Sequence, residues 1–193
     1  MQTGTQRGLA PVKFAMDTAV SQFTVQAFAT GLLSSFGHNP RIGIRDYDGE
    51  IQFVPGSYEK AFVRVSVRTN SMELLDEMKS DDRRKLEQLM YQEVLEVDRY
   101  ADAVYESKEL RVQKLSQELL TAHVSGDLSF HGVTRNHSFD ARVAAIGTML
   151  RISGEFTLLQ SDYRIKPISF AAGALRLKDE LRFSFELVAK MQE

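Results

Sequence analysis

Residues 123–143, HVSGDLSFHGVTRNHSFDARV, decide the fold class of this chain. Small or apolar residues occupy alternate positions from Val124 to Phe130, Gly132 supplies a turn, and the alternation resumes from His137 to Val143. A period of two residues is typical of a β-strand that buries one face. The stretch therefore predicts an antiparallel hairpin with one apolar side.

The same alternation recurs on both sides of this hairpin. It predicts strands near residues 21–29 and 61–68 and, toward the C-terminus, near 150–158 and 181–190. Ile42 and Ile44 alternate with polar residues or glycine just before the run Asp46-Tyr47-Asp48-Gly49. An Asp-Gly pair favours a tight turn, so we expect a second hairpin that returns through Ile51 and Phe53.

The period becomes helical between residues 71 and 97. One face of an amphipathic helix is formed by Leu86, Leu89, Met90, Val94 and Val97. Ser80 is the predicted N-cap of this helix. A shorter helix, capped by Ser71 and carrying Leu74, Leu75 and Met78, is expected before it. Residues 73–99 contain nine acidic and five basic residues, which we interpret as a solvated outer face.

Many antiparallel strands with one helical excursion are typical of a mainly β barrel or sandwich, and we favour the barrel because closure leaves no exposed edges. The prediction is one domain over residues 1–193, with 1–12 flexible and a helical insertion over about 71–97. A barrel of about eight strands is either filled by its side chains or holds one small ligand.

Composition excludes several classes of protein. The 193 residues include no cysteine, so disulfides, thiolate chemistry and cysteine metal sites are excluded. The net charge of −2 argues against a nucleic-acid-binding protein, and no apolar run is long enough to span a membrane. The first residues lack the apolar stretch of a secretory signal, so a cytoplasmic protein is expected.

The inward-facing side chains form the candidate ligand site. A ligand inside the barrel is predicted to contact Phe23, Val25, His38, Ile44, Phe53, Val65, Leu128, Phe130, His137, Phe139, Ile152, Phe156, Phe183 and Phe185. Apolar residues of this kind line a dry core equally well, and the pattern leaves both alternatives open.

The histidines give no clear catalytic or metal site. His131 falls with the polar set of its strand and His137 with the apolar set, so one is expected in solvent and the other inside, which disfavours a metal pair. His137 is either a core histidine bonded to a carbonyl or a contact for a ligand head group. His38 lies in the turn-forming run Gly37-His38-Asn39-Pro40, and either locks the loop or faces the cavity. No catalytic motif is present, so neither catalysis nor a cofactor or metal is expected.

Several motifs resemble the YceI-like family of bacterial lipid-binding, lipocalin-like barrels. They are Asp17 to Phe23, Leu33 to Pro40, Asp82-Arg83 with Glu93 to Val97, Gly126-Asp127-Leu128 followed by Gly132-Val133-Thr134-Arg135, and Gln160 to Ile165. The resemblance extends from Phe14 to Lys190. The chain differs at Val20, Ala101 and Arg164, where the family pattern has His, Pro and Gly.

The resemblance implies an up-and-down barrel with an elongated apolar cavity for a polyisoprenoid, an isoprenoid quinone or a fatty-acid-like lipid. The leading hypothesis is therefore a non-catalytic protein that binds, transports or sequesters such an amphiphile. Two alternatives stay open: an enzyme that uses the barrel histidines on a small substrate, and a stress-related interaction domain with a dry core and an acidic helix for a partner. A homodimer is also left open.

Overall fold

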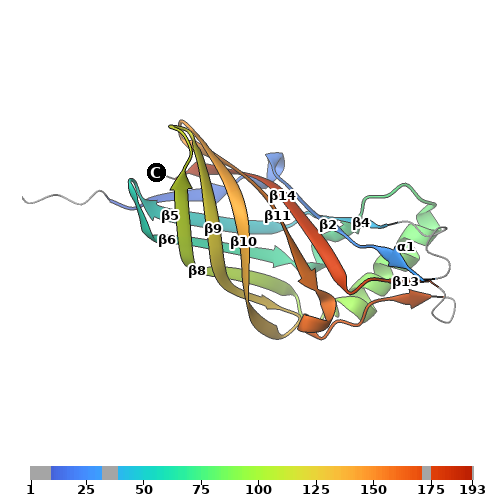
Figure 1. Cartoon of the computed structure of the whole chain (residues 1–193). Helices are drawn as coiled ribbons and strands as arrows, with labels where there is room; N and C mark the ends of the chain where they lie inside the picture. The colour runs from blue at the N-terminus through green and yellow to red at the C-terminus, as the bar shows by residue number, and fades with distance from the viewer. Residues whose placement is uncertain (1–9, 32–38, 171–174, 193) are drawn as a thin grey trace, which may run out of the picture.

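Eight strands close into an antiparallel barrel (Figure 1). The computed structural model describes residues 10–31, 39–170 and 175–192. Around the barrel the order is β1 (Val12–Met16), β5 (Tyr47–Val54), β6 (Ser57–Arg68), β8 (Asp102–Lys114), β9 (Leu119–Phe130), β10 (Val133–Ile146), β11 (Met149–Leu159) and β14 (Glu180–Met191). Pairing of β14 with β1 closes the ring, which confirms the predicted barrel class.

The same sheet continues beyond the closed ring through three further strands. Short turns, η1 (Thr18–Val20) and η3 (Thr69–Ser71), lead from β1 into β2 (Gln22–Gln26) and from β6 into β7 (Met72–Leu74), while β4 (Arg41–Ile44) leads into β5. β2 pairs with β14 and β4, and β4 pairs with β7. β7 is the last strand of this sheet in the described part of the chain.

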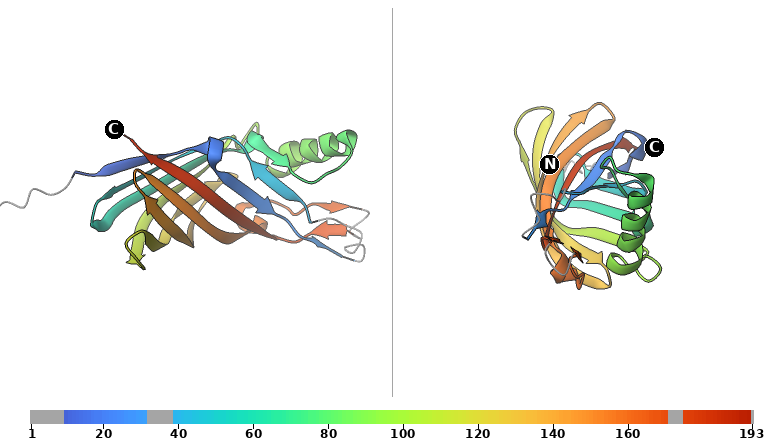
Figure 2. Two further views of the ribbon diagram at one scale, coloured as in Figure 1. Left: turned by 90° about the horizontal axis from the view of Figure 1, so that it is seen from above. Right: turned by 90° about the vertical axis from the view of Figure 1, so that its right-hand side faces the viewer.

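A helix lies beside that last strand. α1 (Ser80–Leu89) and the π-helical turn η4 (Met90–Val94) cover one side of this end of the barrel, as the end-on view of Figure 2 shows. A three-stranded sheet of β3 (Ala29–Thr30), β12 (Ser169–Phe170) and β13 (Leu175–Leu177) projects from the same end. The turn η5 (Gln160–Tyr163) follows β11.

The hairpin predicted over residues 123–143 is confirmed, but the one predicted over 42–53 is wrong. β9 and β10 pair in register, with Val124 opposite Phe139 and Gly126 opposite His137. β4 and β5 instead pair with different neighbours, so the chain bends at Arg45–Asp46 without reversing. Gly49 lies inside β5, where a Cβ would approach the Met16 side chain, with Cε only 2.7 Å away. This glycine therefore makes room for packing and forms no turn.

The predicted long helix is confirmed, while the short helix before it is wrong. The predicted N-cap is wrong, because Ser80 is the first helical residue and the N-cap position is Lys79, which forms no side-chain cap. The apolar stripe of the helical segment faces the barrel, with Met90 buried. Residues 72–74 form β7, because Met72 and Leu74 are buried on the inner face while the backbone pairs with β4. No helix in the described residues has the length and apolar character needed to cross a membrane.

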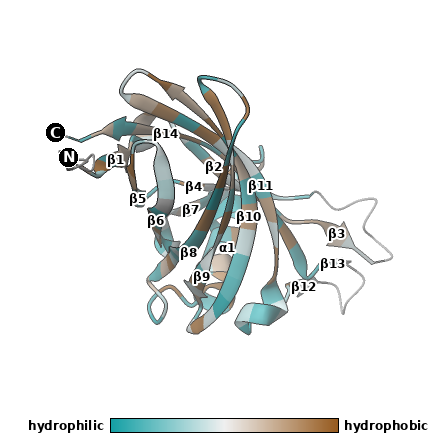
Figure 3. Cartoon of the chain, turned by 60° about the vertical axis from the view of Figure 1, so that its left-hand side comes forward, coloured by the Kyte–Doolittle hydropathy of each residue, from teal (hydrophilic) through white to brown (hydrophobic). Residues whose placement is uncertain are grey.

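The long strands alternate apolar and polar residues along their length (Figure 3). Their inward side chains form the main cluster of buried residues, together with Met90 and Leu95 from the helical segment. β8 is a strand that the sequence pattern did not reveal. A bulge between Ser107 and Glu109 shifts its register, so that the inward side chains change from odd positions such as Tyr105 to even positions such as Leu110.

Candidate functional site

The inward faces of the barrel enclose a cavity of about 1000 Å³. That volume lies at the upper end of the range of about 300–1,000 Å³ that is typical of ligand pockets. The wall comes from strands all around the barrel, and the apolar stripe of the helical segment, through Leu86, Met90 and Val94, completes it on one side. The interior is therefore hollow, unlike the filled core of the dry-core hypothesis.

The predicted site residues are brought together on this wall. The cavity is lined by Phe23, Val25, Ile44, Phe53, Val65, Leu128, Phe130, His137, Phe139, Ile152, Phe156, Phe183 and Phe185. His38, the remaining residue of the predicted set, lies outside the described residues. Whether these side chains contact a ligand stays a prediction.

Aromatic rings form a continuous band along the cavity wall. Phe156 stacks on Phe183 with ring centroids 4.8 Å apart, and Phe139 lies 5.5 Å from Phe156. Phe185 and Phe23 extend the band edge-on, at 5.7 Å from Phe139 and 6.3 Å from Phe185. Rings that brace one another in this way keep the wall rigid without filling the space that they surround.

His137 places a polar group in this apolar wall, as predicted. Its ring lies 5.0 Å from that of Phe156, and its buried Nε2 atom has no hydrogen-bond partner in the described structure. Burial lowers the pKa of the imidazole below the ordinary 6.5, so the ring is neutral at pH 7. The carbonyl expected as a partner for the ring is therefore missing, and a contact with a ligand head group stays a prediction.

His131 is buried, with only 7% of its surface exposed, so the prediction that it faces solvent is wrong. It follows the last residue of β9 in a left-handed backbone conformation (φ 48°), which breaks the strand alternation and turns the ring inward. Its Nδ1 lies 3.1 Å from the carbonyl oxygen of Tyr163, and its Nε2 lies 3.0 Å from Oε2 of Glu96. The His131 ring also packs on the Tyr100 ring, with the two ring centroids 4.2 Å apart.

The remaining histidine with a described position, His123, pairs with Asp140 at 2.8 Å on an exposed surface. Within the described residues, no three His, Asp or Glu side chains gather closely enough to hold a metal ion. Within the aromatic band, His137 is therefore the polar group that the wall presents.

The two ends of the cavity differ in polarity. At the end nearest α1 the lining includes Asp76, Glu77, Lys79 and Asp82. At the opposite end it consists of apolar residues and a tyrosine around the β5–β6 turn and the β8–β9 hairpin: Phe53, Pro55, Tyr58, Ala61, Leu110, Val112 and Leu120. The charged part of the lining is therefore concentrated at the end nearest α1.

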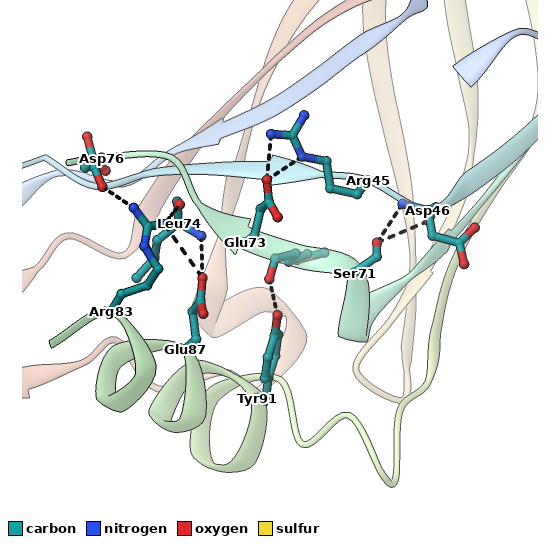
Figure 4. A network of polar contacts seen from close by, with 10 residues as sticks. Arg45, Asp46, Ser71, Glu73, Leu74, Asp76, Arg83, Glu87 and Tyr91 are labelled. Atoms are coloured by element: carbon teal, nitrogen blue, oxygen red, sulfur yellow. Dashed lines mark hydrogen bonds and ion pairs between the residues drawn. The ribbon is translucent and has the colours of Figure 1, made fainter. Parts of the chain in front are cut away.

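Side chains of the helical segment hold it against β7 (Figure 4). Glu87 accepts a hydrogen bond from the Leu74 amide at 3.1 Å, and the Tyr91 hydroxyl donates to the Met72 carbonyl at 2.6 Å. The Arg83 guanidinium donates to the carbonyls of Leu74 and, at 2.7 Å, Asp76. The helix thus satisfies backbone groups that a neighbouring strand would otherwise pair.

Sequence reasoning missed this role because it assigned the charged residues of the segment to a solvated face. Arg83, Glu87 and Tyr91 are spaced at i, i+4 and i+8, which places three hydrogen-bonding groups on one line beside the apolar stripe. It also missed Tyr105 on the cavity wall, whose hydroxyl donates to the His137 carbonyl at 3.2 Å and whose pKa is raised mainly by burial.

The model of the YceI-like domain family matches residues 14–189 of this chain. The chain belongs to the YceI-like family. A curated relative from Pseudomonas fluorescens, a UPF0312 protein, is 29% identical over 123 residues. That match covers 63% of this chain and 59% of the relative, so the chain spans less than two thirds of the relative's length.

Solved structures share the YceI-like fold. BcnA of Burkholderia cenocepacia superposes with a TM-score of 0.71 at 15% identity, covering 91% of this chain and 99% of BcnA. A polyisoprenoid binding domain from Saccharophagus degradans reaches 0.68 at 14% identity, covering 93% and 98%. The YceI protein of Campylobacter jejuni reaches 0.60 at 18% identity, covering 81% and 88%. At these identities the likeness concerns the fold.

Proposed function

We propose that this YceI-like protein binds a long-chain amphiphile of the polyisoprenoid type inside its barrel and carries or sequesters it. The observation that carries the proposal is the cavity of about 1000 Å³ with its apolar wall. Transfer of a chain from water into such a wall is favourable by about 0.8 kcal/mol per CH₂ group, so affinity requires few polar contacts. The polyisoprenoid binding domain from Saccharophagus degradans, which shares the fold, supports this ligand class.

Native mass spectrometry of the protein purified from cells, and again after incubation with a polyprenol, tests the proposal. We expect adducts of lipid mass on the wild-type protein. Ala141→Trp should abolish them, because Ala141 is buried on the cavity wall and an indole there occupies the lumen.

Ala144→Trp is the matched control, because Ala144 lies on the same strand but does not line the cavity. This variant should retain the adducts. Absence of lipid from the wild-type protein, before and after incubation, would contradict the proposal.

A further inference from the structure

Most of the large apolar side chains that are exposed in the described part of the chain lie at one end of the barrel. Of six such side chains, four lie at the end of the barrel farthest from α1: Leu115 (53% exposed), Leu119 (38%) and Ile146 (46%) at hairpin tips, and Met191 (40%) at the adjoining end of β14. Figure 1 shows the hairpin tips and the C-terminus together at the left. We name these four residues the hairpin-tip face. The other two, Val20 and Leu159, lie in η1 and at the end of β11.

Backbone hydrogen bonds join the strand ends that carry this face. The Leu115 amide donates to the Leu119 carbonyl at 2.9 Å within the β8–β9 turn. The Ala145 amide donates to the Glu118 carbonyl at 2.8 Å, which joins that turn to β10. The Met191 amide donates to the Thr148 carbonyl at 2.9 Å, which joins the end of β14 to the β10–β11 turn. The exposed apolar residues are therefore presented by one connected framework.

The hairpin-tip face continues the apolar wall of the cavity around its rim. Leu119 is exposed while the next residue, Leu120, lines the cavity. In the same way Ile146 is exposed and Ala145 lines the cavity. A strand of a water-exposed barrel normally alternates apolar residues inside with polar residues outside. At these tips both sides of the strand are apolar, so an apolar surface leads from the interior to the outside.

Three basic side chains and one acidic side chain, that of Glu118 between Leu115 and Leu119, lie at the same end of the barrel. Lys13, Lys114 and Arg151 are exposed, and none of them forms an ion pair within the part of the chain that the structure describes. Lys114 directly precedes Leu115, and the Lys13 carbonyl accepts from the Gln192 amide at 2.8 Å, next to Met191. Apolar side chains with an excess of basic over acidic neighbours fit the surface of a bilayer with anionic lipids.

We propose that the hairpin-tip face docks on an anionic lipid bilayer and is the portal through which the amphiphile enters and leaves the barrel. The proposal rests on the proposed function. With its polar group toward the acidic and basic residues near α1, the amphiphile has the end of its chain at the hairpin tips. It then enters polar group first, and its chain follows from the bilayer into the cavity along the apolar rim without crossing water.

The decisive experiment compares Leu115→Ser/Leu119→Ser/Ile146→Ser with the wild-type protein. The first measurement is equilibrium binding of a pyrene-labelled polyprenol added from ethanol, which tests the proposed function alone. The second is the rate of transfer of that polyprenol from vesicles of phosphatidylcholine and phosphatidylglycerol. We expect unchanged equilibrium binding and transfer slowed on the order of tenfold, because three apolar contacts with the bilayer are lost.

The matched control is Val20→Ser/Leu159→Ser, which removes the two exposed apolar residues outside the face and should transfer at the wild-type rate. Transfer by the triple variant at the wild-type rate would contradict the proposal that the hairpin-tip face is the portal. So would a wild-type dimer that the triple variant converts to monomer, because the face would then be covered by a second copy. Failure of the wild-type protein to bind polyprenol in the first measurement would instead overturn the proposed function.

The charge requirement is tested by Lys114→Gln/Arg151→Gln. Cosedimentation of this variant with vesicles that contain phosphatidylglycerol should fall several-fold relative to wild type, and the preference over pure phosphatidylcholine vesicles should shrink. Lys85→Gln/Lys166→Gln removes two exposed lysines away from the tips and should bind both vesicles as the wild type does. Equal losses in the two variants would show that the net charge, and not this face, directs docking.

Discussion

Three residues other than glycine adopt left-handed backbone conformations, and they meet at one place. They are Glu96 (φ 46°), His131 (φ 48°) and Arg164 (φ 60°) among the described residues. The Glu96 carboxylate contacts the His131 ring, whose other nitrogen faces the carbonyl of Tyr163, next to Arg164. Backbone strain is thus concentrated where the segment after η4, the β9–β10 turn and η5 come together. These contacts hold the end of the helical wall to the barrel.

Arg164→Gly should stabilise the protein. Arg164 stands where the family pattern has glycine, and a side chain in a left-handed conformation costs about 1–2 kcal/mol, which the greater freedom of an unfolded glycine offsets in part. We expect a gain of about 0.5–1 kcal/mol in the free energy of unfolding, measured with urea. Arg164→Ala keeps a Cβ and should show no such gain, so equal stability of the two variants would contradict the explanation.

His137 should make stability depend on pH. Its pKa is lowered in the folded protein by burial, so below about pH 6.5 the unfolded chain binds a proton that the folded chain resists. The neutral His137 ring makes its full contribution to the free energy of unfolding above about pH 6.5. This contribution is lost as the pH falls toward the pKa that His137 has in the folded protein. Urea unfolding at about pH 7.5 and about pH 5.5 should show a smaller decrease for His137→Phe than for wild type. An identical decrease would mean that other groups cause it.

At the scale of elements, the helical segment takes the place of a strand. β7 ends the sheet, and an exposed edge there would leave Met72 and Leu74 with unpaired backbone groups. Side chains from three turns of the helical segment pair with that edge, while its apolar stripe closes the cavity. One segment therefore completes both the hydrogen bonding and the wall.

Arg83→Ala should weaken this attachment. Arg83 donates to two carbonyls at the edge of β7, and loss of both bonds should cost about 1–3 kcal/mol in stability. Amide hydrogen exchange in residues 72–76 and 83–94 should accelerate more than in β9 and β10. Arg84→Ala is the control, because Arg84 forms only an exposed pair with Asp81 and its loss should cost less than about 1 kcal/mol.

The bulge in β8 depends on a glycine in β9. A Cβ on Gly126 would lie 2.6 Å from the Cα of Ser107 and would press on the Glu106 carbonyl. These atoms belong to the backbone and cannot turn aside, so Gly126→Ala should lower the free energy of unfolding by at least about 2 kcal/mol. Ser153→Ala, at an exposed position of β11, should change it by less than about 0.5 kcal/mol. A mild effect of the first substitution would show that β8 gives way there.

At the scale of the whole molecule, the cavity couples binding to stability. A ligand that binds only the folded barrel should raise the free energy of unfolding by about 2.7 kcal/mol at a free concentration of 100 times its Kd. Thermal unfolding of delipidated protein with increasing polyprenol should therefore shift upward. Ala141→Trp should show no shift, and Ala144→Trp should follow the wild type. A shift that persists in Ala141→Trp would place the ligand outside the lumen.

Local patterns predicted those parts of the fold and site that depend on the backbone pleat alone. The β9–β10 hairpin and the inward set from Phe23 to Phe185 follow from alternation, and all of that set with described positions lies on the cavity wall. The prediction failed where distant segments decide. Asp46 to Gly49 resemble a turn until β1 and β6 pair with β5, and residues 72–74 resemble a helix until β4 pairs with them.

The sequence by itself determined that this chain forms antiparallel strands with one apolar face, because side-chain direction in a strand alternates regardless of what lies across the barrel, whereas closure of the ring depends on the pairing of β1 with β14. Only the tertiary structure decided that the inner face surrounds a cavity, since the distance between opposite walls depends on the number and tilt of the strands. It also decided that the helical segment lines this space and that one rim is apolar on both sides. These properties arise from contacts between segments far apart in the chain, and the spacing of apolar residues within one segment does not predict such contacts.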